Sequence, residues 1–309
     1  MKMATRDSYG SALAELSKVY DNLFVLDADL AEATKTKAFK TACPERFIDC
    51  GIAEGNMMSV AAGLATCNNI VFASSFAMFA AGRAFEQIRN SVCYPKLNVK
   101  IGATHAGISV GEDGATHQCC EDIALMRVLP NMTIINPCDD IEARLAVKAA
   151  CETYGPMYLR FGRLAVEDVN APDYEFKLGK GVLLREGTDV TIIATGLMVG
   201  EALKAYDILK EKGISARVVN IHTIKPIDKD IIIESAEKTG VIVTAEEHSV
   251  IGGLGSAVAE VLAETKPTKL LRVGVEDRFG MSGPAVELLK KFGLSAEGIV
   301  DKVLKALNK

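Results

Sequence analysis

Short apolar runs alternate with longer amphipathic segments along most of the chain. Residues 70–72, 132–135 and 190–194 are apolar runs of strand length, and each is followed by a segment with the spacing of a helix. Strands that alternate with helices are typical of a mostly parallel sheet with helices on both faces. The expected strands are residues 23–26, 47–48, 70–72, 97–101, 132–135, 157–161, 190–194, 216–220, 241–245 and 270–275. The expected helices begin near Asp7, as a capping residue, and near Glu54, and cover residues 76–93, 120–128, 139–154, 199–212 and 228–238.

The cysteines mark a division within the chain. All eight lie before residue 152, and a stretch with Pro172, Gly179 and Gly181 follows. A chain of 309 residues is also about twice the length of a common domain. We therefore expect an α/β protein of two domains, residues 1–170 and 171–309, each a mostly parallel sheet flanked by helices.

Composition excludes several classes of partner. A net charge of -5 without a basic run argues against nucleic acid and against an anionic membrane surface. The longest nearly apolar run, residues 70–82, is too short to cross a bilayer, and the first ten residues lack the apolar core of a secretory signal. Without CxxC pairs, the cysteines indicate reduced thiols and a cytoplasmic protein. Zinc at His117, Cys119 and Cys120 is disfavoured because adjacent cysteines point apart.

The richest chemistry lies in residues 101–118, read as IGATHAGISVGEDGATHQ. Its glycines break both helix and strand, so His105, Glu112, Asp113 and His117 are expected on a loop that follows a strand. Open parallel sheets bind ligands at the carboxyl ends of their strands. The stretch is therefore a candidate site, and the alternative is a long surface loop with titratable side chains.

Two further features suit a flat, nitrogen-containing ligand. Glu54 opens a helix among apolar neighbours, which would raise its pKa and favour sharing a proton with a bound base; alternatively it only complements the helix dipole. Phe76 and Phe79 lie three residues apart and either form a slot for a ring or belong to the core.

The second half offers a different possibility. Gly252, Gly253 and Gly255 follow an expected strand, with Glu276 about twenty residues on, which is similar to a dinucleotide-binding turn although Val258 replaces the third glycine. This pattern leaves open an oxidoreductase centred on Gly253, and it places His248 on a loop.

Arg6 and Arg163 stand at the two ends of the first expected domain. Each is either a phosphate-binding arginine or an ordinary surface charge.

Taken together, these residues resemble the C-terminal half of transketolase nearly end to end, over its pyrimidine-binding and C-terminal domains. Residues 51–54 (GIAE) resemble the helix start that carries the essential glutamate of that family, and residues 103–118 resemble its substrate-channel signature. The resemblance implies that Glu54 hydrogen-bonds the pyrimidine of thiamine diphosphate and that His117 lies near the reacting centre. It further implies cofactor contacts from Phe76, Phe79 and Asp29, and contacts with the sugar phosphate from Arg6, His105, Asp113 and Arg163.

Two positions depart from the family pattern. The upstream phenylalanine of the family falls on Ala73, and its phosphate-binding serine falls on Ala33, with Thr34 adjacent.

The diphosphate motif of the family is the larger departure. Its Gly-Asp-Gly and asparagine lie on a separate N-terminal domain, and the nearest pattern here, residues 111–114 with Asn136, is interrupted by Glu112. We expect no metal site in this chain and assign Mg²⁺ or Ca²⁺ to a partner subunit.

The resemblance therefore implies the C-terminal subunit of a split transketolase, which transfers a two-carbon ketol unit between sugar phosphates. It would be active only with an N-terminal transketolase subunit, as a homodimer core within a heterotetramer. The alternatives are a subunit like deoxyxylulose phosphate synthase or like the β-subunit of 2-oxo acid dehydrogenases, the oxidoreductase, and a non-catalytic interaction subunit.

Overall fold

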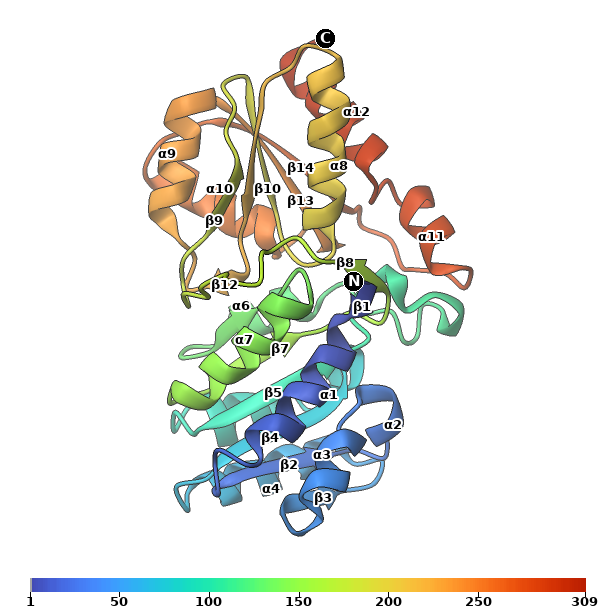
Figure 1. The fold of residues 1–309 in the computed structure, drawn as a ribbon, viewed down its shortest axis with the longest axis vertical. Coiled ribbons are helices and arrows are strands. Elements are labelled where there is room, and N and C mark those ends of the chain that lie inside the picture. Colours follow the sequence, from blue (N-terminus) through green and yellow to red (C-terminus); the bar gives the residue numbers. More distant parts are fainter. Residues whose placement is uncertain (1) are drawn as a thin grey trace.

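The computed structural model describes residues 2–309 and places two α/β units end to end (Figure 1). The first is built on a seven-stranded sheet in the order β12-β6-β7-β5-β4-β2-β3, in which all pairs but β12 with β6 are parallel. Its strands are β2 (Leu23–Asp27), β3 (Phe47–Asp49), β4 (Ile70–Phe76), β5 (Val99–Thr104), β6 (Thr133–Ile135), β7 (Met157–Arg160) and β12 (Thr223–Lys225). Its helical segments are α1 (Thr5–Leu16), α2 (Ala31–Thr34), α3 (Lys37–Ala42), η1 (Pro44–Arg46), α4 (Glu54–Ala65), η2 (Phe79–Arg83), α5 (Phe85–Gln87), η3 (Ile88–Cys93), η4 (Ile108–Asp113), α6 (Asp122–Arg127) and α7 (Asp140–Glu152).

The second unit is a five-stranded sheet in the order β14-β13-β10-β11-β9, mostly parallel, with β9 antiparallel at one edge. Its strands are β9 (Val182–Arg185), β10 (Val190–Ala194), β11 (Ala216–Asn220), β13 (Val241–Ser249) and β14 (Lys269–Val275). Its helices are α8 (Met198–Glu211), α9 (Lys229–Thr239), α10 (Leu254–Glu264), α11 (Ala285–Lys291) and α12 (Ala296–Leu307). The expected α/β fold with two mostly parallel sheets is confirmed.

Several local expectations need correction. The helix expected over residues 76–93 is interrupted: β4 continues to Phe76 because it pairs with β5 up to Thr104, and two π-helical turns flank the short α5. Asp7 lies in the first turn of α1, whose N-cap is Ala4. His248 is not on a loop, since β13 extends to Ser249 and buries it completely.

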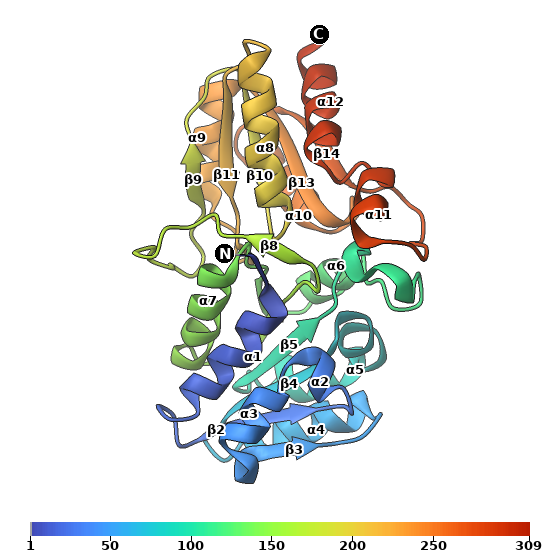
Figure 2. The same cartoon turned by 45° about the vertical axis from the view of Figure 1, so that its right-hand side comes forward.

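Short strands bring distant segments together at the junction of the two units. A two-stranded ribbon pairs β1 (Lys2–Ala4) with β8 (Ala165–Glu167), and next to it Arg6 N donates to the carbonyl of Gly162 at 3.3 Å. In addition β12, from the second half of the chain, joins the edge of the first sheet. Figure 2 shows β8 and α6 lying where the two units meet. The ribbon therefore places both ends of the first unit beside each other.

A buried ion pair also ties the two units. Arg160 of β7 donates from Nε to Asp122 Oδ2 of α6 at 2.8 Å, and its Nη2 donates to the carbonyl of Glu247 in β13 at 2.9 Å. Both charged side chains are buried, with 4% and 0% of their surface exposed. The nearby guanidinium holds the pKa of Asp122 below its usual value, although burial opposes this shift.

The eight cysteines are free thiols. Within residues 2–309, none of the helices combines the length and the apolar character that crossing a membrane requires.

The junction ion pair generates a stability prediction. Arg160→Ala leaves the Asp122 carboxylate buried without its partner, so it should lower the free energy of unfolding by about 3–5 kcal/mol. Lys229→Ala, which breaks an exposed ion pair with Glu264, should cost less than about 1 kcal/mol. Urea unfolding at pH 7 measures both changes, and equal small losses would show that the pair does not stabilise the junction.

Candidate active site at the carboxyl edge of the first sheet

Two neighbouring strands, β4 and β5, place the first candidate residues at one edge of the sheet. Phe76 ends β4 and pairs in register with Thr104, which ends β5, and His105 follows directly. Because the strands are parallel, both side chains emerge at the carboxyl edge of the sheet. The rings of Phe76 and His105 stack with centroids 3.8 Å apart.

Phe79 and His117 complete an aromatic cluster around this stack. The ring of Phe79 is 5.8 Å from that of Phe76 and nearly parallel to it, at 19°. His117 meets Phe79 edge-on at 5.3 Å. The paired phenylalanines therefore form one aromatic surface, with the histidine from the following loop against its side.

Glu54 connects to this surface through an arginine that the sequence reading missed. It begins α4 with only 4% of its side chain exposed, and its Oε1 accepts a hydrogen bond from Arg83 Nη1 at 3.1 Å. The guanidinium carbon of Arg83 lies 4.2 Å from the ring centroid of Phe79, and the side chain is 53% exposed. Glu54 is thus buried among apolar neighbours, as expected, but it also has an oppositely charged partner in Arg83. The spacing of Arg83, four residues after Phe79, is the signal that could have found it.

His105 is held in one tautomer by its neighbours. Arg6 Nη1 lies 2.7 Å from His105 Nε2, and since an arginine only donates, Nε2 must accept. His105 Nδ1 then carries the proton and donates to Thr104 Oγ1 at 2.9 Å. Burial, reinforced by the charges of Arg6 and Arg163, lowers the pKa of His105 to about 3, so the ring is neutral at pH 7.

Arg163 organises the loop from His105 to Gln118, called the histidine loop below. Its Nη1 donates to the carbonyl of Val110 and lies 3.5 Å from Glu112 Oε2 and 3.7 Å from Asp113 Oδ2. Its charge also lowers the pKa of Arg6, after the larger effect of burial. The two arginines and Asp113 therefore belong to the same edge as the aromatic cluster.

Asp29 is not brought into this group of contacts. It lies after β2 in a left-handed conformation, with φ of 61°, and its N–H donates to Asp49 Oδ1 at 3.0 Å. The neighbouring Thr34 is buried and donates to Asp27 Oδ2 at 2.7 Å, so its hydroxyl is already engaged.

The glycine-rich turn in the second unit has its donors occupied. Leu254 N and Gly255 N, at the start of α10, donate to the carboxylate of Glu246 at 2.6 and 2.8 Å. A Cβ on Gly253 would overlap that carboxylate. A protein side chain thus stands where a dinucleotide turn would receive a phosphate, which argues against the oxidoreductase alternative.

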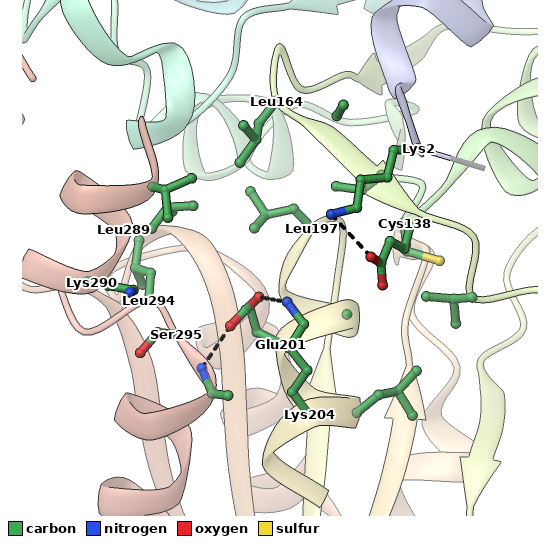
Figure 3. A pocket seen from close by; sticks show the side chains of 18 of the residues that line it. Lys2, Cys138, Leu164, Leu197, Glu201, Lys204, Leu289, Lys290, Leu294 and Ser295 are labelled. Atoms are coloured by element: carbon green, nitrogen blue, oxygen red, sulfur yellow. Dashed lines mark hydrogen bonds and ion pairs between the residues drawn. The ribbon is translucent and has the colours of Figure 1, made fainter. Parts of the chain in front are cut away.

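A separate cavity of about 840 Å³ lies between β8 and helices α8, α11 and α12. Figure 3 shows apolar side chains such as Leu164 and Leu289 on its walls, with Lys2 and Lys204 each joined to a carboxylate; the pairs are Lys2 with Glu167 at 3.1 Å and Lys204 with Glu201 at 2.7 Å. No candidate site residue lines this cavity. The strand edge, which gathers the reactive groups, remains the better candidate.

The side chains at the strand edge fit one part of the implied cofactor. A buried carboxylate, linked through Arg83 to one of two nearly parallel aromatic rings, suits a protonated, flat nitrogen heterocycle such as an aminopyrimidine. In contrast, no three His, Cys, Asp or Glu side chains of residues 2–309 come together in a way that could hold a metal ion. Burial also raises the pKa of the Cys119 and Cys120 thiols, which disfavours the zinc-binding thiolate form.

This fold and site define a two-domain α/β protein whose first sheet gathers a buried carboxylate, paired phenylalanines and two histidines at its carboxyl edge. The family model for the pyrimidine-binding domain of transketolase matches residues 1–168, and that for the C-terminal domain of transketolase matches residues 179–299. The chain belongs to the transketolase family, as its C-terminal section.

Individual relatives agree with this assignment. A putative transketolase C-terminal section of Methanocaldococcus jannaschii is 54% identical, over 98% of this chain and 96% of that protein. Human transketolase is 38% identical over 100% of this chain but only 50% of its own length. A solved structure, described as a split gene transketolase, inactive beta4 tetramer, has a TM-score of 0.91 and 55% identity, covering 100% of this chain and 99% of that one. The expected resemblance to a split transketolase is confirmed.

The environment of His105 generates a pH prediction. Its folded pKa of about 3 lies below the ordinary value of 6.5, so the unfolded chain binds a proton that the folded chain does not. This histidine therefore lowers stability as the pH falls below about 6.5. Between pH 7 and pH 4.5, the unfolding free energy of the wild type should fall by about 2.5 kcal/mol more than that of His105→Gln. Urea titrations across this range test the difference, and parallel curves for the two proteins would contradict it.

Proposed function

We propose that this chain is the C-terminal subunit of a two-chain transketolase and transfers a two-carbon ketol unit between sugar phosphates. The observation that carries the proposal is the connected group of Glu54, Phe79 and His117 at the carboxyl edge of a pyrimidine-binding domain. The same edge carries two arginines suited to an anionic substrate.

Each side chain has a role that follows from its surroundings. Thiamine diphosphate, when bound, supplies the carbon nucleophile that accepts the two-carbon unit. The carboxylate of Glu54 accepts a hydrogen bond from the protonated pyrimidine nitrogen and so holds that proton in place. Phe76 and Phe79 would bind the ring by stacking, which would require Arg83, whose side chain is half exposed, to leave the face of Phe79. His117, at the side of this surface, donates to or accepts from groups at the reacting carbon.

The substrate phosphate belongs at the arginine end of the edge. Arg6 and Arg163 together provide forked donors that match a phosphate. Asp113 accepts from a sugar hydroxyl, and His105, neutral at pH 7, presents no positive charge of its own and serves to orient Arg6. Asp29 stays assigned to the cofactor at the same edge, although it contacts none of these groups.

A second polypeptide completes the site. The diphosphate carries two or more negative charges that need a divalent cation, and we assign Mg²⁺ or Ca²⁺ to an N-terminal subunit. Two copies of each subunit would form a heterotetramer around a homodimer core, in the cytoplasm. The exposed side chain of Ile52, 75% accessible and two residues before Glu54, supports a contact surface beside the site.

The central assignment predicts the behaviour of a Glu54 variant. Glu54→Ala should lower kcat of the assembled enzyme at least about 100-fold, because the proton on the pyrimidine loses its acceptor. The control is Glu86, whose carboxylate is exposed on α5: Glu86→Gln should leave kcat unchanged. A coupled assay with sugar phosphates, alongside circular dichroism to verify folding, tests both, and near-normal turnover by Glu54→Ala would remove the assignment.

The division of the cofactor site generates a binding prediction. Isothermal titration of the isolated chain with thiamine diphosphate and Mg²⁺ should show an affinity at least about 100-fold weaker than that of the mixed subunits, since the charged diphosphate lacks its partner. Equally tight binding by the chain alone would contradict a divided site.

A further inference from the structure

A buried carboxylate of the C-terminal domain holds the histidine loop by a hydrogen bond. Glu247, in β13, is 4% exposed, and its Oε1 accepts a hydrogen bond from the backbone N–H of Ser109 at 2.5 Å. Gly107 lies directly against the same carboxylate, where a Cβ would overlap the carboxyl carbon of Glu247, and its φ of +82° also favours glycine. Loop and carboxylate therefore approach as closely as the backbone allows.

The far end of the loop has its own attachment to the C-terminal domain. Gln118 Nε2 lies within hydrogen-bonding distance of the carbonyls of Ile108 at 3.1 Å, Gly111 at 3.2 Å and Met281 at 2.9 Å. Met281 belongs to the segment between β14 and α11. The loop is thus closed on itself and fixed to the second unit at two places.

Ser109, which Glu247 holds, is adjacent in sequence to a residue that contacts one of the proposed substrate-binding side chains. The next residue, Val110, accepts a hydrogen bond from Arg163, and Arg163 pairs with Asp113 at 3.7 Å. A shift of Ser109 would therefore move the anchor of Arg163, and with it the partner of Asp113. The position of these two proposed substrate contacts depends on a residue that reaches neither substrate nor cofactor.

We propose that Glu247 is a positioning residue for the transketolase reaction: the C-terminal domain uses it to hold the histidine loop in the shape that binds the sugar phosphate. This inference rests on the proposed function and adds a role for the second domain. Burial raises the pKa of Glu247 to about 7, and the charge of Arg160 and the Ser109 amide oppose that rise. The group is thus poorly solvated, and its contacts with the protein replace those with water.

The neighbouring Glu246 offers a matched control. It lies in the same strand, is likewise fully buried, and burial raises its pKa to about 7 as well. It also accepts backbone amides, but those of Leu254 and Gly255 within its own domain. Removal of either carboxylate therefore removes a similar structural contact, but only removal of Glu247 releases Ser109 of the histidine loop.

The kinetic experiment uses the chain assembled with its N-terminal subunit and a phosphorylated donor sugar. Glu247→Ala should lower kcat/KM by about 10- to 100-fold, mainly through a higher KM, because the loop groups are misplaced. Glu247→Gln keeps an acceptor oxygen for Ser109 and should restore kcat/KM to within about threefold of the wild type. Glu246→Ala should stay within about twofold per folded enzyme.

A second measurement separates positioning from general destabilisation. In hydrogen exchange on the isolated chain, the amides of residues 109–113 should lose at least about tenfold protection in Glu247→Ala and keep it in Glu246→Ala. Should Glu247→Ala fail to fold, Glu247→Asp decides: it keeps a buried charge near Arg160 but withdraws the carboxylate from Ser109, so it should show the same two effects.

Equal losses of kcat/KM and of loop protection in the Glu246 and Glu247 variants would overturn the positioning role. So would a Glu247→Gln variant as poor as Glu247→Ala. An assembled wild-type enzyme without transketolase turnover would instead refute the proposed function, while the exchange data would still report on the contact between Glu247 and the loop.

Discussion

The parallel pairing of β4 with β5 is the constraint on which the site depends. The register ends both strands at one level, with Phe76 opposite Thr104, so that Phe76 and His105 stack at 3.8 Å. Phe79 and His117 then pack around this stack. A shift of one residue in this register would turn Phe76 to the other face of the sheet and dissolve the cluster.

The site gathers groups that suit the pyrimidine half of the proposed cofactor. A buried carboxylate normally needs a partner, and here Glu54 finds one in Arg83, a side chain that is itself half exposed. Such an arrangement holds the carboxylate in place yet leaves the partner free to exchange. Two relatives match this chain over nearly their whole length, whereas human transketolase matches it over only 50% of its own length.

The two adjacent glutamates of β13 contact different parts of the chain. Glu246 receives the amides at the start of α10, which accounts for a glycine-rich turn that is similar to a dinucleotide site. Glu247 receives the amide of Ser109 across the domain junction. One strand thus stabilises its own helix with one carboxylate and supports the loop of the other domain with the next. The ion pair of Arg160 with Asp122 lies beside them, and Arg160 also donates to the carbonyl of Glu247 across the junction.

The sequence by itself determined the α/β class, most strands, and the short motifs around Glu54, His105 and His117, because apolar periodicity and glycine placement are local properties of the chain. Strands such as Val190–Ala194 and Ala216–Asn220 have the bounds expected from their apolar runs. Local pattern failed at residues 76–93, where pairing with β5 extended the strand and π-helical turns replaced a continuous helix.

Only the tertiary structure decided which of these residues meet. The antiparallel pairing of β1 with β8 brings Arg6 beside the segment of Arg163, and β12 crosses to the sheet of the other unit, and neither pairing has a local signal. The contacts of Glu54 with Arg83 and of Glu247 with Ser109 span 29 and 138 residues. Such contacts depend on the register of the sheets and on the packing of the two units, which are properties of the whole chain rather than of any segment.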